Sequence, residues 1–203
     1  MTRKPPSHQR LYEIASQQGG YFTAEQARRA GFTSKLIWYH ARRGRFARLH
    51  RGLYRLHQYP SSPEDHILEA WLAAGPAAVV SHESALSVHR LSNVVPARVH
   101  LTVPRTHRWV GRRLPQGVTL HTTTRPLRPV DVVIRGPLRV TSAARSIFDA
   151  AESGTAPEQI VLAVRQALEQ GLTTRRELLS VVDQRSQRVA DLIHRGIEEM
   201  SVA

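Results

Sequence analysis

A short run in the middle of the chain carries the side chains that a hydrolase would use. Ser81, His82, Glu83 and Ser84 follow one another, and a serine beside a histidine can act as a nucleophile with its general base. Neither the Gly-x-Ser-x-Gly elbow of α/β-hydrolases nor an oxyanion loop accompanies these residues. The start of a helix explains the run more simply, with Ser81 as the N-cap and Glu83 in the first turn. The sequence therefore predicts no catalytic residue here.

Histidines in the same region raise the question of a zinc site. His82 and His89 would share one face of a helix, and three further histidines are near in sequence, namely His66, His100 and His121. A zinc site needs at least three converging ligands, and spacing along the chain does not show convergence. We expect histidines scattered over the surface and the core, with no bound metal and no cofactor. The chain has no cysteine, which excludes disulfides and cysteine-based zinc fingers.

A nuclease is the enzyme class that remains as an alternative. Asp131, Asp149 and Glu152 are the carboxylates that could hold its metal ions. However, Ile134-Arg135-Gly136 stands where a Glu-x-Lys motif would follow Asp131, and no lysine comes after Lys35. A nucleotidyltransferase would need a Gly-Ser pair followed by two close aspartates, and that pattern is missing, as are Gly-rich phosphate-binding loops. We therefore expect a protein that is not an enzyme.

Positive charge is concentrated at the start of the chain. The net charge is +13, and residues 1–60 hold 12 Lys or Arg against 2 Asp or Glu, whereas residues 61–203 hold 17 against 14. A general preference of the genome for arginine would not explain why the first 60 residues contain so few acidic residues. Such a field attracts a phosphate polymer. Nucleic acid is favoured over a membrane because no long amphipathic basic helix and no apolar run of ~20 residues are present, so we expect a cytoplasmic protein.

Three short helices are predicted within this basic segment, over residues 7–18, 24–30 and 34–43. The second begins with a capping box, in which the Thr23 hydroxyl accepts from the amide of Gln26 and the Gln26 side chain reaches back. Gly31 ends it with a tight turn, Thr33 or Ser34 caps the third helix, and Gly44 ends that helix. The interval 24–43 therefore has the outline of a helix-turn-helix.

The third helix has two distinct faces. Ile37 and Ala41 should face the core, with Leu36 and His40 flanking them. The outward residues are then Ser34, Lys35, Trp38, Tyr39 and Arg42. Cations and aromatics on one stripe suit the major groove of DNA. The alternative is that the two aromatic rings pack against the next hairpin or the next domain.

A basic hairpin is predicted directly after this helix, with its tip at residues 50–52. Glycine at residue 52 suits the positive φ of a tight turn, and arginines 45, 48, 51 and 55 line the two strands. A basic hairpin after a recognition helix is the wing of a winged helix-turn-helix. We expect Arg43, Arg45, Arg48 and Arg51 to contact phosphate or the flanking minor groove.

Several pieces of this segment together resemble the N-terminal domain of AbiEi-type antitoxins, which belong to type IV toxin–antitoxin systems: residues 20–23, 26–27, 31–32, 42–46 and 51–54. Further pieces resemble the C-terminal region of that family: residues 73–76, 80–86, 99–104 and 140–149. The resemblance spans roughly residues 8–170. It implies a repressor that binds inverted repeats in its own promoter and counteracts a nucleotidyltransferase toxin. Whether the two proteins touch is left open, and a DNA-binding module of a nuclease-like or other regulatory protein without an antitoxin role is the alternative.

The rest of the chain mixes strands and helices without regular alternation, so we expect an α+β fold with a winged helix-turn-helix over residues 1–59 and an α+β domain over residues 64–203. Residues 59–63 read as the linker between them. A long basic hairpin loop is expected over residues 105–113, with Arg105, Arg108, Arg112 and Arg113 as a possible second basic surface. We expect a monomer or weak dimer in solution that binds DNA cooperatively.

Overall fold

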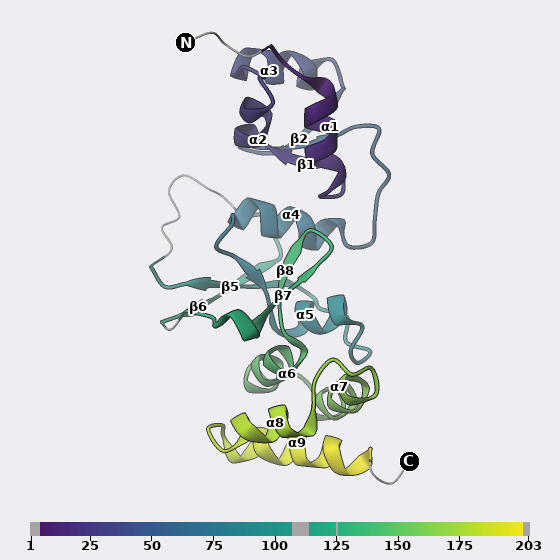
Figure 1. Cartoon of the computed structure of the whole chain (residues 1–203), viewed down its shortest axis with the longest axis vertical. Helices are drawn as coiled ribbons and strands as arrows, with labels where there is room; N and C mark the ends of the chain where they lie inside the picture. Colours follow the sequence, from purple (N-terminus) through teal and green to yellow (C-terminus); the bar gives the residue numbers. More distant parts are fainter. Residues whose placement is uncertain (1–4, 107–113, 125, 201–203) are drawn as a thin grey trace. The chain divides into compact units, whose positions relative to one another are not determined.

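The chain is an α+β protein whose computed structural model describes residues 5–106, 114–124 and 126–200 (Figure 1). It divides into two compact units. The first unit contains residues 5–77 together with 114–116 and 136–138, and the second unit contains the other described residues. Among the described residues, no helix is both long and apolar enough to cross a membrane.

The first unit consists of helices and a small three-stranded sheet. Its elements are α1 (His8–Ser16), β1 (Tyr21–Thr23), α2 (Ala24–Arg29), α3 (Ser34–Arg42), β2 (Phe46–His50), β3 (Leu53–Leu56) and α4 (Asp65–Ala74). The sheet has the antiparallel order β1-β3-β2. The three helices and the hairpin are those predicted from the sequence, while β1 adds a strand that the sequence did not reveal.

Capping side chains fix where these helices begin. The Thr23 hydroxyl accepts from Gln26 N at 3.2 Å and Gln26 Oε1 accepts from Thr23 N at 2.7 Å, which is the expected capping box. The Thr33 hydroxyl accepts from Leu36 N at 3.1 Å and so caps α3. Gly52 has a φ of +82° at the hairpin tip, a conformation that favours glycine.

Aromatic rings form the core of the first unit. Phe22, Phe32 and Phe46 are each at most 4 % exposed, and Leu11 and Ile37 pack with them. The Phe22 and Phe46 rings meet edge to face with centroids 4.9 Å apart, a favourable aromatic geometry. This core holds α3 and the β2–β3 hairpin on one small scaffold.

Helix α4 groups with the first unit, although the sequence placed the domain boundary before it, at residues 59–63. Asp65 forms an ion pair with Arg55 at 3.0 Å, and Glu69 lies 2.6 Å from His50 Nε2. The Arg55 guanidinium also donates to the Pro60 carbonyl oxygen. These polar contacts tie the hairpin to the residues that follow it.

The second unit contains a five-stranded mixed sheet and most of the remaining helices. Its elements are β4 (Val79–Val80), α5 (His82–His89), β5 (Val99–Pro104), β6 (Val118–Thr123), the 3₁₀ turn η1 (Pro129–Asp131), β7 (Val132–Arg135), β8 (Leu138–Thr141), α6 (Ala143–Glu152), α7 (Pro157–Glu169), α8 (Arg175–Val182) and α9 (Gln187–Glu199). The strand order is β6-β5-β4-β8-β7. Helices α6 to α9 lie together beyond the sheet (Figure 1), around buried residues such as Ile147, Phe148 and Ile160.

The connection between β5 and β6 differs from the expectation. The two strands pair in parallel, with His100 opposite Thr119 and Thr102 opposite His121. Two parallel strands cannot be joined by a tight hairpin, so the expectation of a hairpin between β5 and β6 is wrong. Arg105 is exposed and its amide donates to the Thr123 carbonyl oxygen. The other three arginines of the expected basic surface, Arg108, Arg112 and Arg113, lie outside the described residues.

Candidate nucleic-acid interface

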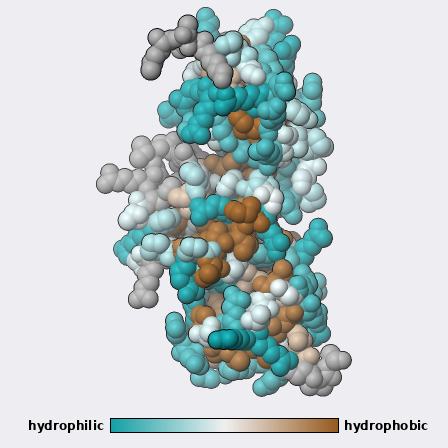
Figure 2. All heavy atoms as spheres, viewed as in Figure 1, coloured by the Kyte–Doolittle hydropathy of each residue, from teal (hydrophilic) through white to brown (hydrophobic). Residues whose placement is uncertain are grey.

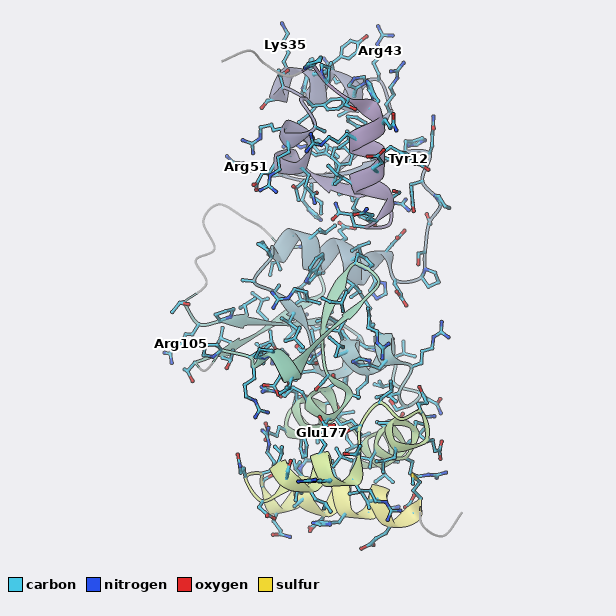
Figure 3. The ribbon with its side chains drawn as sticks, viewed as in Figure 1. Tyr12, Lys35, Arg43, Arg51, Arg105 and Glu177 are labelled. Atoms are coloured by element: carbon cyan, nitrogen blue, oxygen red, sulfur yellow. The ribbon has the colours of Figure 1, made fainter. Side chains whose placement is uncertain are left out.

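The outward face of α3 carries the predicted row of residues. Ser34, Lys35, Trp38, Tyr39 and Arg42 are all exposed, while Ile37 is 2 % and His40 is 4 % exposed. Capping at Thr33 and the turn at Gly44 fix the two ends of the helix. The row therefore faces solvent along the length of α3, and Figure 3 shows Lys35 and Arg43 extending outward from this end of the first unit.

The inward face of α3 differs by one position from the expectation. His40, predicted to flank the core, is buried, whereas Ala41 is only partly buried. The His40 ring packs edge-on against His8 with centroids 5.0 Å apart and lies 5.1 Å from the Phe46 ring. Burial, followed by the charges of His8 and Arg45, lowers the pKa of His40. The ring is therefore neutral at neutral pH and belongs to the core.

The two aromatic rings of the row stack with arginines instead of entering the core. Trp38 is 54 % and Tyr39 is 45 % exposed. The Arg42 guanidinium carbon lies 4.9 Å from the Trp38 ring centroid, and that of Arg43 lies 5.2 Å from the Tyr39 ring centroid. Each is a cation–π pair that orients a guanidinium on the surface. Their donors stay available for a ligand.

The β2–β3 hairpin presents further cations. Arg45, Arg48 and Arg51 are exposed, and Arg51 projects from the hairpin in Figure 3. The pairing of β2 with β3 shifts register between Arg48 and His50, an irregularity that re-aims the side chains around it. The hairpin follows α3 through Gly44, and Arg45 N donates to the His40 carbonyl oxygen at 3.0 Å. This short connection keeps the hairpin next to the helix.

Arg55, the fourth arginine that lines the hairpin, does not join this surface. It pairs with Asp65 and its guanidinium carbon lies 5.2 Å from the Tyr21 ring centroid. Burial, followed by the charge of Asp65, raises the pKa of Tyr21 to about 12. Arg55 is therefore a structural residue that joins the sheet to α4.

Six exposed cations remain on α3 and the hairpin, and we call them the basic surface: Lys35, Arg42, Arg43, Arg45, Arg48 and Arg51. Within the described part of the chain, no carboxylate lies within ion-pair distance of any of them. Hydrophilic residues also cover most of the face of the first unit visible in Figure 2. Cations that no carboxylate neutralises, two of which (Arg42 and Arg43) are oriented by aromatic rings, are suited to a polyanion.

The residues that suggested a hydrolase make internal hydrogen bonds. The Ser81 hydroxyl accepts from the Thr102 hydroxyl at 2.8 Å, and the Ser84 hydroxyl accepts from His100 N at 2.9 Å. Glu83 accepts from the Thr155 hydroxyl at 2.8 Å. Ser81 stands at the N-cap position of α5 as predicted, but its side chain does not accept the capping hydrogen bond. The run therefore anchors α5 to the sheet.

The carboxylates that suggested a nuclease are each held by an arginine. Asp131 accepts two hydrogen bonds from the Arg128 guanidinium, at 3.0 and 2.9 Å, and these hydrogen bonds lower its pKa. Asp149 pairs with Arg145 at 2.8 Å and Glu152 with Arg185 at 2.7 Å. The one described group of three or more residues that could share an ion contains none of these carboxylates.

Of the histidines weighed as zinc ligands, two are separate and three come together. His66 is exposed and lies 2.9 Å from the Pro63 carbonyl oxygen, and His89 is buried against the Thr141 carbonyl oxygen at 2.7 Å. His82, His100 and His121 have nitrogen atoms within 4.8 Å of one another. Sequence spacing missed this group because parallel pairing of β5 and β6, which no local pattern shows, brings two of its members together.

Comparisons with known proteins agree with this architecture. A solved structure, the RV2827C protein from Mycobacterium tuberculosis, superposes with a TM-score of 0.58 at 17 % identity, over 96 % of this chain and 79 % of that chain. At this identity the likeness shows a shared fold. A comparison with curated proteins found no match.

A family model described as "Transcriptional regulator, AbiEi antitoxin" matches residues 9–57. The match covers α1 to β3, which carry the whole basic surface. The description of this family is that of a transcriptional regulator and antitoxin. The resemblance seen in the sequence is thus confirmed for this segment: residues 9–57 match the model of a family of AbiEi antitoxin transcriptional regulators.

Proposed function

We propose that the chain represses its own operon by binding inverted repeats in the promoter with its basic surface. Helix α3 enters the major groove, where Lys35 and Arg42 read base edges and Trp38 and Tyr39 pack on sugar, phosphate or thymine methyl groups. Ser34 contacts the backbone at the start of the helix. The observation that carries this proposal is the row of exposed cations and aromatics on α3, which has no partner among the described carboxylates.

The hairpin completes the interface. Arg43, Arg45, Arg48 and Arg51 contact phosphate on either side of the major-groove site, with the tip of the hairpin at the minor groove. These contacts set affinity and carry little sequence information. One chain occupies each half of an inverted repeat, so a protein that is a monomer or weak dimer in solution binds cooperatively as two copies on DNA.

The direct test is binding of the full chain to its own promoter. Fluorescence anisotropy would compare the promoter fragment with a shuffled fragment of equal length and composition, at low and at physiological salt. We expect the promoter to be bound at least ~10³-fold more tightly at physiological salt. Equal affinity for the two fragments would remove the claim of a specific repressor. Arg176→Ala removes an exposed arginine of α8 that is remote in sequence from the basic surface. This variant should bind the promoter as tightly as the wild type and so controls for the loss of one positive charge.

We further propose that the chain counteracts a nucleotidyltransferase toxin. Support comes from the family model that matches residues 9–57 and from the resemblance of residues 73–76, 80–86, 99–104 and 140–149 to the C-terminal region of AbiEi antitoxins. The test first asks whether the neighbouring reading frame encodes a nucleotidyltransferase, and then co-expresses that protein with the chain, both from promoters that lack the operator. Growth should be restored although repression plays no part. Continued growth arrest with the wild-type chain present would leave a regulator without an antitoxin role.

A double variant, Lys35→Ala with Arg42→Ala, separates the two roles. We expect it to lose promoter binding and to restore growth as the wild type does, since we place the antitoxin role in the second unit. Loss of both activities in a variant that remains folded would assign antitoxicity to the basic surface instead. Co-purification of the two proteins would then show whether neutralisation uses direct contact.

A further inference from the structure

Three histidines from three different elements meet on one side of the five-stranded sheet. His82 is the first residue of α5, His100 lies on β5 and His121 lies on β6. His100 Nδ1 is 3.0 Å from His121 Nε2, and the His82 and His121 rings stack with centroids 3.5 Å apart. One nitrogen of each ring lies within 4.8 Å of the others. The group is separate in sequence from the basic surface, which lies within residues 35–51.

The sheet register produces this convergence. Because Thr102 pairs with His121 in the parallel β5–β6 ladder, and because residues two apart share a face of a strand, His100, Thr102 and His121 all point to the same side. Strand β4 runs antiparallel to β5 with Val80 opposite Leu101, and Ser81 N donates to the His100 carbonyl oxygen at 3.0 Å. The chain then continues into α5, which places His82 on the same side of the sheet as the other two histidines.

The spacing of the nitrogen atoms suits a small ion. Two ligands at the Zn–N distance of about 2.0–2.1 Å in tetrahedral geometry have nitrogen atoms roughly 3.3 Å apart. The separation between His100 Nδ1 and His121 Nε2 is close to that value. Burial, followed by the neighbouring imidazoles, lowers the pKa of His82 to about 3, and burial also lowers the pKa of His100 and of His121. All three rings are therefore neutral at neutral pH, which is the form that binds metals.

Residues behind the histidines hold them in place. His82 Nδ1 lies 2.9 Å from the Ser81 hydroxyl oxygen, which also accepts from the Thr102 hydroxyl. A hydrogen bond from Nδ1 to a neighbouring oxygen fixes the tautomer of a metal-binding histidine and leaves Nε2 for the ion. His82 also has a φ of +53°, a left-handed conformation that is uncommon for residues other than glycine. The surrounding contacts hold it there.

We propose that His82, His100 and His121 bind one divalent transition-metal ion, with zinc as the preferred ion and water at the fourth position. Three imidazoles with a nearby hydroxyl pair form a borderline-soft nitrogen site, which suits zinc, cobalt or nickel and not magnesium or calcium. The ion would join the start of α5 to β5 and to the edge strand β6. Its role is to stabilise the second unit, and it takes no part in contacting DNA.

The first test titrates Co²⁺ into full-length protein that carries no histidine tag and has been stripped with a chelator. We expect saturation at one equivalent and the visible absorption of cobalt with nitrogen and oxygen ligands. No thiolate-to-cobalt absorption should appear, because the chain has no cysteine. Zn²⁺ should displace the Co²⁺ and abolish the colour. An absence of saturable binding would mean that His100 and His121 share only a hydrogen bond.

Variants assign the site. His121→Gln should abolish saturable binding, and Ser81→Ala should weaken binding by roughly 10- to 100-fold, as expected for the partner behind a ligand. The matched control is His66→Gln, which removes an exposed histidine of α4 outside the group and should bind Co²⁺ like the wild type. Equal loss in His66→Gln and His121→Gln would overturn the assignment.

Thermal unfolding of the wild-type chain tests the proposal without any substitution that could itself unfold the protein. With free Zn²⁺ at ~100 times the dissociation constant, the Tm of the second unit should rise by roughly 5–10 °C over its value in chelator. Mg²⁺ at the same concentration should not raise it. A Tm that zinc leaves unchanged would contradict the proposal even if His121→Gln failed to fold.

Discussion

Arg42 is the residue at which the proposed DNA interface can be tested most finely. It is exposed near the end of α3 and stacks on Trp38, which orients its guanidinium without using its hydrogen-bond donors. A guanidinium oriented in this way can donate two hydrogen bonds to O6 and N7 of a guanine, a contact worth ~1–3 kcal/mol of discrimination. Arg42→Ala should therefore lower affinity for the operator by roughly 5- to 150-fold.

The same change should weaken binding to shuffled DNA much less. On shuffled DNA the side chain contributes only one cation near the backbone. Its loss should therefore lower the salt slope, which is the slope of log affinity against log salt concentration, by about one, and there is no sequence preference to lose. Arg42→Lys separates charge from geometry, because lysine keeps the charge and loses the planar fork. We expect Arg42→Lys to retain the salt slope of the wild type and to lose most of the operator preference.

Anisotropy titrations on both DNAs, at two salt concentrations, measure these quantities. Arg176→Ala serves as the control for loss of one positive charge. Because Arg42 is exposed, its variants should change the free energy of unfolding by no more than ~0.5 kcal/mol, which a urea titration checks. An equal loss of affinity on operator and shuffled DNA would show that Arg42 contacts backbone only, and the recognition role of α3 would have to be withdrawn.

Three further predictions follow from the fold. Arg48→Ala should weaken binding to all DNA sequences alike and lower the dependence of affinity on salt by about one phosphate contact. Because the basic surface holds six cations, the affinity of the wild type should fall ~10³-fold between 50 and 200 mM salt. An affinity that hardly changes with salt would contradict contacts between these cations and phosphate. Burial lowers the pKa of His89 despite its hydrogen bond to Thr141. The unfolded chain keeps the ordinary pKa of about 6.5, so the stability that His89 contributes is complete above that pH and falls as the pH drops below it, by up to ~1.4 kcal/mol per pH unit. Urea titrations of His89→Gln should show a shallower loss below about pH 6.5 than the wild type, and parallel curves would contradict the assignment. Phe22→Ala leaves a cavity at a fully buried site beside Phe46. It should lower the free energy of unfolding by ~3–5 kcal/mol, measured by circular dichroism, and should also abolish DNA binding, measured by anisotropy. Unchanged stability would show that Phe22 does not belong to the core of the first unit.

Local signals predicted the parts of the fold that local contacts determine. The starts of α2 and α3 were predicted from their N-caps, Thr23 with Gln26 and Thr33. An N-cap forms between residues no more than four apart, so the local sequence reveals it. The outward row of α3 followed from helical periodicity in the same way. Strand β1 was missed because it is three residues long and exists through pairing with β3, whose partner residues come 30 to 34 positions later in the chain.

Long-range pairing also explains what the sequence missed in the second unit. Local sequence patterns do not give the relative direction of two strands, so the sequence predicted a hairpin where β5 and β6 pair in parallel. The same ladder places His100 next to His121, a contact that spacing in the sequence cannot show. On the hairpin, the sequence placed Arg55 with the other arginines but could not show that Asp65 of α4 is its partner.

Hydroxyl-radical footprinting of the protein tests the central claim most directly, because it reports which side chains DNA covers. Trp38, Tyr39 and Tyr12 are reactive aromatics that are 54 %, 45 % and 58 % exposed in the free chain, and Tyr12 lies on α1, outside the proposed interface. With promoter DNA bound, mass spectrometry should find Trp38 and Tyr39 protected and Tyr12 oxidised as in the free chain. Oxidation of Trp38 and Tyr39 that promoter DNA leaves unchanged would contradict a DNA-binding role for α3.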